Sequence, residues 1–425
     1  MLLQFSVENF KSFKEKAVLS LEGSVDRSLP NNYVEVGKEK FLKTAAVFGS
    51  NAAGKSNLFQ ALTAAILTLR QSSARQVNEP LVYIVPFKFD DETINKPTSF
   101  EFVFVASDSK KYVYGFSATR KEIVEEYLYV YNTSKPTTVF ERKGDTYLFT
   151  DPARKRDMDP LTLRNTSNKL FLSTATAWNS KYTTIPYTWL ESGINTYSTD
   201  FKLLLKQIVP MFENDNDDSL REFINNLLHE ADISIDDYES DIKDQTPEEF
   251  TQNIPPELRP LLSTVSTNNH KKITFTTKHI VEKEGKEKQY SLSLAEESQG
   301  TTDLFLFAPV LKKAFETGET LFIDEFDKSI HPMLIEFIMS LFNNPEINKG
   351  NAQLVITTHT LSLMTLKLFR RDQIYFVEKD RKTGASDLYS LDDFSPRKSD
   401  DIKKAYSLGR YGAIPLIFSE AAVWG

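Results

Sequence analysis

The 425-residue chain has no cysteine and only five histidines. The absence of cysteine excludes disulfide bonds, thiolate catalysis and cysteine-based metal sites, and the scattered histidines do not supply the spaced ligands of a structural zinc site. The chain also has no run of about 18 apolar residues, and residues 1–8 lack the basic region and apolar core of a signal peptide. We therefore expect a cytoplasmic protein that does not contact a membrane.

Charge of one sign is concentrated in one part of the chain. The formal net charge is -8, and residues 213–249 alone hold 14 acidic side chains against two basic ones. We interpret this acidic segment as a solvated face or loop, with partner docking as the alternative. Because the acidity is local, the composition leaves nucleic-acid binding open.

A loop bounded by two glycines follows a short apolar run at residues 45–48. The pattern Gly49-x-x-x-x-Gly54-Lys55-Ser56 is that of a nucleotide phosphate loop. The glycines let backbone N–H groups point at phosphate oxygens, Lys55 would bind the β- and γ-phosphates of ATP, and Ser56 would bind Mg²⁺ where a helix begins. The predicted nucleotide-binding residues are Gly49, Ser50, Asn51, Ala52, Ala53, Gly54, Lys55, Ser56 and Asn57.

Two later apolar runs, residues 320–323 and 353–357, are typical of parallel strands buried on both faces. Polar residues follow each run. The carboxyl ends of such strands hold ligand groups, and the phosphate loop would lie at the same edge. Asp324 would then hold Mg²⁺, Glu325 would act as the catalytic base on the attacking water, and His359 would reach the γ-phosphate. A plain strand end is the alternative for each of these residues.

The patterns predict an α/β fold in three segments. Residues 1–150 would form an N-terminal lobe that contains a hairpin, the phosphate loop and an antiparallel β subdomain. This subdomain is predicted from segments rich in Phe, Tyr and Val, which are residues 82–89, 100–105, 112–118 and 127–131. Residues 151–290, polar and broken by prolines, predict a mainly helical insertion. Residues 291–425 would form the C-terminal lobe.

The order of these motifs resembles that of the ABC-type ATPases. Within them the chain is most similar to the soluble branch that contains SMC-like repair ATPases, the overcoming-lysogenization-defect family and the abortive-infection AAA-15 ATPases of bacterial defence. The segments that carry the resemblance are 9–13 (Asn-Phe-Lys-Ser-Phe), 49–56, 297–301 (Glu-Ser-Gln-Gly-Thr), 321–332, 355–359 and 406–415. It implies an ABC-type P-loop ATPase head with an antiparallel β subdomain and a mainly helical insertion.

The resemblance also implies a homodimer, or a higher even-numbered oligomer, with ATP between the phosphate loop of one protomer and the signature loop of its partner. The signature residues would be Ser298, Gln299 and Gly300, with Gln299 where the family has glycine. Asp327 matches the family's D-loop aspartate, and Lys11 and Ser12 match an N-terminal turn that approaches the nucleotide. A helix cap and an exposed hairpin tip are the alternatives for these positions. The family's Q-loop glutamine has no assigned counterpart.

The implied activity is hydrolysis of ATP to ADP and phosphate with Mg²⁺, in a molecular switch that controls a separately encoded effector in anti-phage abortive infection. A nuclease is one candidate for that effector. An ATP-stabilised scaffold with little turnover and an SMC-like DNA-repair ATPase are the alternatives. Relatives in the overcoming-lysogenization-defect family carry a nuclease domain after the ATPase, whereas 66 residues follow His359 here. We therefore expect that the isolated chain neither cuts nucleic acid nor is toxic.

Overall fold

The computed structural model describes residues 1–197, 204–245, 270–328, 330–397 and 399–415. Contacts divide the chain into two compact units. Unit 1 consists of Met1–Ser198, Ala314–Asp327 and Ile335–Gly425, and unit 2 of Thr199–Lys313 and Lys328–Leu334. The boundaries after residues 313 and 334 fall inside the helices α9 (Gln299–Thr317) and α10 (Pro332–Asn343), and those after residues 198 and 327 do not. None of the four coincides with the predicted boundaries after residues 150 and 290.

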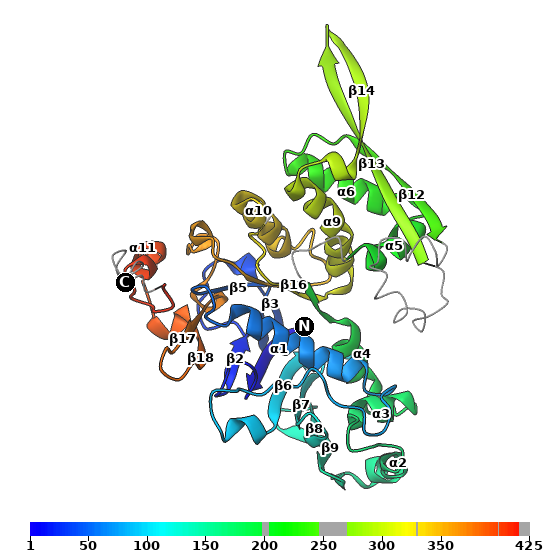
Figure 1. Cartoon of the computed structure of the whole chain (residues 1–425), viewed down its shortest axis with the longest axis vertical. Helices are drawn as coiled ribbons and strands as arrows, with labels where there is room; N and C mark the ends of the chain where they lie inside the picture. The colour runs from blue at the N-terminus through cyan, green and yellow to red at the C-terminus, as the bar shows by residue number, and fades with distance from the viewer. Residues whose placement is uncertain (198–203, 246–269, 329, 398, 416–425) are drawn as a thin grey trace, which may run out of the picture. The chain divides into compact units, whose positions relative to one another are not determined.

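A six-stranded sheet forms the centre of unit 1 (Figure 1). Its strands, in spatial order, are β11 (Ile194–Tyr197), β15 (Thr320–Ile323), β16 (Gln353–Thr357), β5 (Thr44–Phe48), β17 (Ile374–Lys379) and β18 (Ser386–Ser390). All neighbours are parallel except β17 and β18. Every residue of β5, β15 and β16 is buried, as expected of parallel strands covered on both faces. The predicted parallel strands at 320–323 and 353–357 are confirmed.

A seven-stranded antiparallel sheet is the second layer of unit 1. Its strands, in spatial order, are β10 (Thr146–Leu148), β9 (Pro136–Lys143), β8 (Ile123–Tyr131), β7 (Lys111–Ala118), β6 (Thr98–Val105), β1 (Leu2–Glu8) and β2 (Ala17–Ser20). Buried and partly buried residues alternate along β6, so that its phenylalanines face one side. The predicted N-terminal hairpin and antiparallel subdomain are confirmed.

One predicted strand is wrong. Residues 82–89 form no strand, because their backbone groups bond to the turn at residues 9–13 instead of to a sheet. Lys11 N donates to Val85 O at 2.9 Å, and Phe87 N donates to the Asn9 side chain at 3.0 Å. Pro86, which has no N–H group, adds to the interruption.

Helix α1 (Lys55–Arg70) follows the phosphate loop directly. Its buried face includes Leu58, Leu62 and Ile66, which are spaced as a helix requires. These side chains share one hydrophobic core with residues of both sheets. The helix start is therefore fixed by packing against both layers. Unit 1 also contains α2 (Pro152–Thr162), α3 (Phe171–Ala177), α4 (Thr184–Ser192), α11 (Ile402–Ser407), β3 (Tyr33–Val36) and β4 (Glu39–Leu42).

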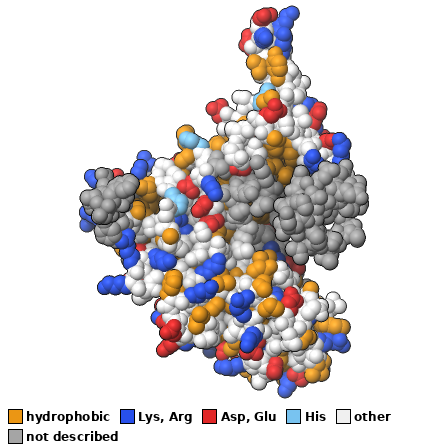
Figure 2. Space-filling model, viewed as in Figure 1, with side chains coloured by type: hydrophobic (Ala, Val, Ile, Leu, Met, Phe, Trp, Pro, Cys, Tyr) orange, Lys and Arg blue, Asp and Glu red, His pale blue; other side chains and the backbone are white. Residues whose placement is uncertain are grey.

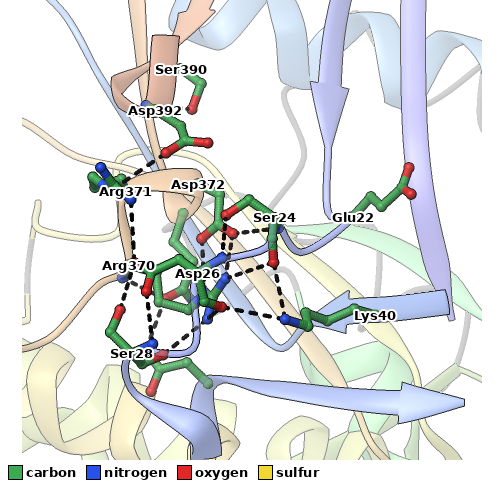
Figure 3. Close-up of polar contacts among 12 residues, drawn as sticks. Glu22, Ser24, Asp26, Ser28, Lys40, Arg370, Arg371, Asp372, Ser390 and Asp392 are labelled. Carbon is green, nitrogen blue, oxygen red and sulfur yellow. Dashed lines mark hydrogen bonds and ion pairs between the residues drawn. The ribbon is translucent and has the colours of Figure 1, made fainter. Parts of the chain in front are cut away.

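A buried arginine joins two distant segments of unit 1 (Figure 3). The Arg370 side chain, 1% exposed, donates through Nε and Nη2 to both oxygens of Asp372 at 2.9 and 2.7 Å. Its Nη1 donates to the carbonyl oxygens of Asp26 and Ser28 at 2.7 and 2.9 Å. A fully bonded buried ion pair of this kind fixes the chain that precedes β17 against the segment before β3.

Unit 2 contains α5 (Leu205–Glu213), α6 (Ser219–Glu230), the first part of α9 and an antiparallel sheet of β12 (Asp237–Gln245), β13 (His270–Lys283) and β14 (Lys286–Ser293). Its core includes the packed rings of Phe212, Tyr238, Phe275 and Phe305. In its described part, the predicted insertion at residues 151–290 therefore contains helices and also strands that the prediction missed, which are β11 in unit 1 and β12, β13 and part of β14 in unit 2. Strands β12 and β13 bury Tyr238, Ile273 and Phe275. Strand β14 is exposed at every residue, and charged side chains cover the tip of its hairpin with β13 (Figure 2).

The acidic segment is ordered structure in its described part, up to residue 245. Asp215 accepts bonds from the backbone N–H groups of Leu220 and Arg221 at 2.9 and 3.1 Å, so it caps the start of α6. The Arg221 guanidinium binds Asp237 at 2.7 Å. The interpretation as a loop is therefore wrong for most of this part of the segment, which forms α6 and β12. The interpretation as a solvated face agrees with the structure, because most of its acidic side chains are exposed. Residues 246–249 lie outside the described residues.

Candidate functional site

The phosphate loop connects β5 to α1 and requires glycine at both ends. A Cβ atom on Gly49 would collide with the carbonyl oxygen of Val377 in β17. Gly54 has a φ of +119°, and a Cβ there would collide with the side chains of Ser386 and Ser12. The backbone of the loop therefore lies closer to its neighbours than any other residue type permits.

Lys55, the first residue of α1, is 5% exposed. Its Nζ donates to the carbonyl oxygens of Gly49 and Ser50 at 2.8 and 3.1 Å. Burial lowers the pKa of Lys55 to about 8, while the three carboxylates of segment 324–327 act in the opposite direction. The ammonium group and these carboxylates are therefore electrostatic neighbours at the carboxyl edge of the sheet.

The two acids after β15 are held by a threonine at the end of β16. The Thr357 hydroxyl donates to Asp324 Oδ1 at 2.6 Å and accepts a bond from the Glu325 backbone N–H at 2.7 Å. Glu325 has a φ of +52°, a left-handed conformation that is uncommon for a residue other than glycine. Thr357 therefore fixes both acids. The prediction did not include it, although it ends the same apolar run that places His359.

Asp327 binds the segment that carries the predicted histidine. Its Oδ2 accepts bonds from the His359 backbone N–H at 2.9 Å and from the Thr360 hydroxyl at 2.7 Å. Burial, and then the charge of Lys55, lowers the pKa of His359 below 6.5, whereas the nearby carboxylates oppose this shift. The lowered pKa favours the neutral imidazole. The structure brings Lys55, His359 and the acids of segment 324–327 to one edge of the sheet.

A cavity of about 1080 Å³ opens at this edge. Its lining includes Gly49–Asn51, Thr358 and His359, as well as residues 378–381 and the C-terminal Ile414 and Pro415. Ligand pockets commonly measure about 300–1,000 Å³. The cavity is therefore large enough for a complete nucleotide, and the phosphate loop forms part of its wall.

Two serines brace the phosphate loop from distant parts of the chain. Ser386 Oγ donates to Ala53 O at 2.5 Å, and Ser386 N donates to Ser12 O at 2.6 Å. The amide of Asn57 donates to Ser12 Oγ at 2.8 Å. Asn57 was predicted to bind nucleotide, and its amide is part of this brace. No local sequence signal identifies Ser386, because it lies 333 residues from Ala53.

The turn at residues 9–13 contacts helix α1 through two side chains. The Lys11 ammonium group binds Gln60 Oε1, and partial burial lowers the pKa of Lys11. Ser12 Oγ accepts the hydrogen bond from Asn57 at the end of the predicted nucleotide-binding segment. The approach of Lys11 to the nucleotide stays a prediction.

The predicted signature residues lie in unit 2, at the start of α9. Ser298 Oγ accepts a bond from Thr301 N at 3.2 Å, as a helix-capping serine does. Gln299 Nε2 donates to Asp303 Oδ1 at 2.7 Å. Gly300 adds no side chain to this turn. The helix cap, which was the alternative interpretation of these residues, is therefore present. A cap satisfies only part of the first turn, so the other N–H groups there stay available to an anion.

No helix in the described parts of the chain is long and apolar enough to cross a membrane. The chain matches no curated protein. It is similar in structure to an Smc head domain bound to the C-winged helix domain of ScpA, with 13% identity, coverage of 92% of this chain and 97% of that chain, and a TM-score of 0.42.

Two further solved structures are similar to the chain at low identity. For RecF with ATP, from the RecFOR pathway, the identity is 15%, the coverage 91% of this chain and 97% of that chain, and the TM-score 0.38. For CbiO1 from Clostridium perfringens, part of the ABC transporter complex CbiONQ, the identity is 12%, the coverage 97% of this chain and 96% of that chain, and the TM-score 0.32.

A family model matches residues 45–365, about three quarters of the chain. This range includes the phosphate loop, the predicted signature and the acids after β15. The predicted α/β fold with an antiparallel β subdomain is confirmed, and the match to a family of AAA domains agrees with the predicted P-loop ATPase head. The narrower AAA-15 assignment stays a prediction. The chain belongs to the family described as "AAA domain, putative AbiEii toxin, Type IV TA system".

Proposed function

We propose that the chain binds ATP with Mg²⁺ at residues 49–57 and hydrolyses it to ADP and phosphate. The observation that carries this proposal is the electrostatic grouping of Lys55 with His359 and the three carboxylates of segment 324–327. A buried ammonium beside a glycine-bounded loop suits phosphate oxygens, and the carboxylates suit a metal ion and a water molecule.

The residues at this edge fit Mg²⁺. This ion takes oxygen ligands and usually binds one or two protein side chains together with phosphate oxygens and water. Asp324 supplies a carboxylate that Thr357 orients through a 2.6 Å hydrogen bond, and Ser56 supplies a hydroxyl in the first turn of α1. Bound there, Mg²⁺ would neutralise charge on the β- and γ-phosphates.

Glu325 is the proposed general base. Its backbone is bonded to the oriented Thr357 hydroxyl, which fixes the position from which its carboxylate accepts a proton from the attacking water. The lowered pKa of His359 favours the neutral imidazole, which has one N–H donor for a γ-phosphate oxygen. The bonds from Asp327 to the backbone at His359 and to Thr360 keep this histidine in place.

We further propose that ATP closes a homodimer, or a higher even-numbered oligomer. Ser298, Gln299 and Gly300 of one protomer would meet the γ-phosphate held by the other. This proposal is supported by the position of the three residues at the start of the 19-residue helix α9. The N–H groups of the first turn and the helix dipole favour an anion there. In the D-loop role, Asp327 would approach the same interface.

The biological role we propose is control of a separately encoded effector, for which a nuclease is one candidate, in anti-phage defence. Its support is the description of the family, which refers to an AbiEii toxin. ATP binding and hydrolysis would then switch the oligomer between two states that hold and release the effector.

Titration calorimetry with ATP and Mg²⁺ tests the site. Lys55→Ala should abolish tight binding, because it removes the charged contact to the phosphates. Lys38→Ala, at an exposed lysine between β3 and β4, is the matched control and should bind ATP as the parent does. Equal affinity of Lys55→Ala and the parent would contradict the proposed site.

A further inference from the structure

Residues 406–415 are one of the segments in which the sequence resembles the ABC-type ATPases, but they have no role in the proposed site so far. In the structure they fold over β17. The rings of Tyr406 and Tyr411 stack on Phe376 with centroid distances of 5.4 and 5.8 Å and interplanar angles of 12° and 17°. The Tyr406 hydroxyl donates to Ala413 O at 2.8 Å. The segment is therefore fixed by aromatic packing and by a buried hydrogen bond.

A second set of contacts fixes the end of this segment. The Tyr389 hydroxyl, from β18, donates to Tyr411 O at 2.7 Å. Gly412 has a φ of +65°, and a Cβ there would collide with the Tyr389 hydroxyl and lie too close to the Glu378 carboxylate. These contacts fix the backbone up to Gly412. Ile414 and Pro415 follow directly, so the fold limits where they can lie.

Ile414 and Pro415 line the cavity that the phosphate loop also lines. Tyr406 and the turn at residues 378–381 contribute to the same wall. A triphosphate would occupy only the end of the cavity at Gly49–Asn51. With a volume of about 1080 Å³, the cavity has room for the rest of the nucleotide beside the C-terminal segment.

We propose that residues 406–415 and the turn 378–381 form the subsite for the ribose and base of the bound nucleotide. This inference rests on the proposed function, because the phosphate loop must hold the triphosphate. A nucleobase has apolar faces and polar edges. Ile414 and Pro415 offer apolar contact for a face, and the exposed Glu378 carboxylate offers acceptors for amino or hydroxyl groups.

The test compares two ligands that share the phosphates but not the nucleoside. Titration calorimetry would measure the affinity of the full chain for Mg-ATP and for Mg-tripolyphosphate. Ile414→Asn should weaken ATP binding about tenfold, because it replaces an apolar contact, and leave tripolyphosphate binding unchanged. Leu408→Asn, at a 67% exposed leucine of the same segment that does not line the cavity, should change neither affinity.

Unchanged tripolyphosphate affinity also reports that the variant is folded. If Ile414→Asn loses both ligands, Ile414→Ala, which adds no polar group, replaces it and should still weaken ATP binding alone. Equal affinity of Ile414→Ala and the parent for ATP, or equal affinity of the parent for ATP and tripolyphosphate, would overturn the subsite. Full binding of both ligands by Lys55→Ala would instead overturn the proposed function, so the two failures are distinguishable.

Discussion

Raising the pH through the pKa of Lys55 should weaken ATP binding. Burial lowers this pKa to about 8, so the ammonium is mostly protonated at about pH 7 and about nine-tenths neutral at about pH 9. If only the protonated form binds the phosphates tightly, the dissociation constant rises about tenfold between these pH values, equivalent to about 1.4 kcal/mol. Below about pH 7 Lys55 is almost fully protonated and should contribute no further change in the dissociation constant.

Calorimetric titrations with Mg-ATP at constant ionic strength measure this dependence. Lys55→Arg is the control, because a guanidinium keeps its charge throughout the range and should give a flat profile. His359 does not interfere, since its pKa lies below 6.5. A flat profile for the parent, or the same slope for Lys55→Arg, would refute the assignment of Lys55 to the phosphates.

The lowered pKa of Lys55 makes the fold more stable at high pH, whereas it makes ATP binding weaker there. The unfolded chain keeps the proton of Lys55 up to about pH 10.5, whereas the folded chain loses it at about 8. Between these values the unfolded state binds more protons, so the contribution of Lys55 to the free energy of unfolding rises with pH. Weaker nucleotide binding at high pH is therefore not a sign of a less stable fold.

Two further predictions concern the oligomer and the core. Ser298→Arg combined with Gly300→Asp should inactivate the partner's site. Mixing this variant with Lys55→Ala should restore part of the ATPase activity, because one intact composite site forms in the heterodimer. No recovery in confirmed heterodimers would contradict shared sites. Arg370→Ala should lower the free energy of unfolding by about 3–5 kcal/mol in denaturant titrations, because it leaves a buried carboxylate unpaired. Arg371→Ala, at a partly exposed arginine, should cost about 1 kcal/mol or less, and equal losses would contradict this account.

The phosphate loop and its neighbouring strands could be predicted because their signals are local. Residues 49–56 are contiguous, and the runs 320–323 and 353–357 are apolar throughout because both faces of each strand are covered. Polar residues after such a run identify the edge of the sheet where ligands bind. For this reason the sequence alone is sufficient to place Asp324, Glu325 and His359 at this edge.

Contacts between distant residues could not be predicted. Ser386 braces Ala53 across 333 residues, and Thr357 orients Asp324 through a side-chain hydrogen bond, so no local pattern marks either brace. Strand β14 was missed for another reason. It is exposed at every residue, and its polar sequence lacks the alternation that marks a half-buried strand. Strand β13 does alternate, with Ile273, Phe275 and Thr277 buried, and the prediction did not use this signal.

Single-turnover hydrolysis tests the central claim most directly. The purified chain would be mixed in excess over labelled ATP with Mg²⁺, and the label followed to ADP and phosphate. The parent should convert all bound ATP, whereas Glu325→Gln should bind ATP with unchanged affinity and convert it very slowly, because the amide keeps the shape of the side chain and lacks its basic oxygen. ATP that stays intact on the parent would favour a scaffold over an ATPase, and equal rates for the parent and Glu325→Gln would contradict the proposed mechanism.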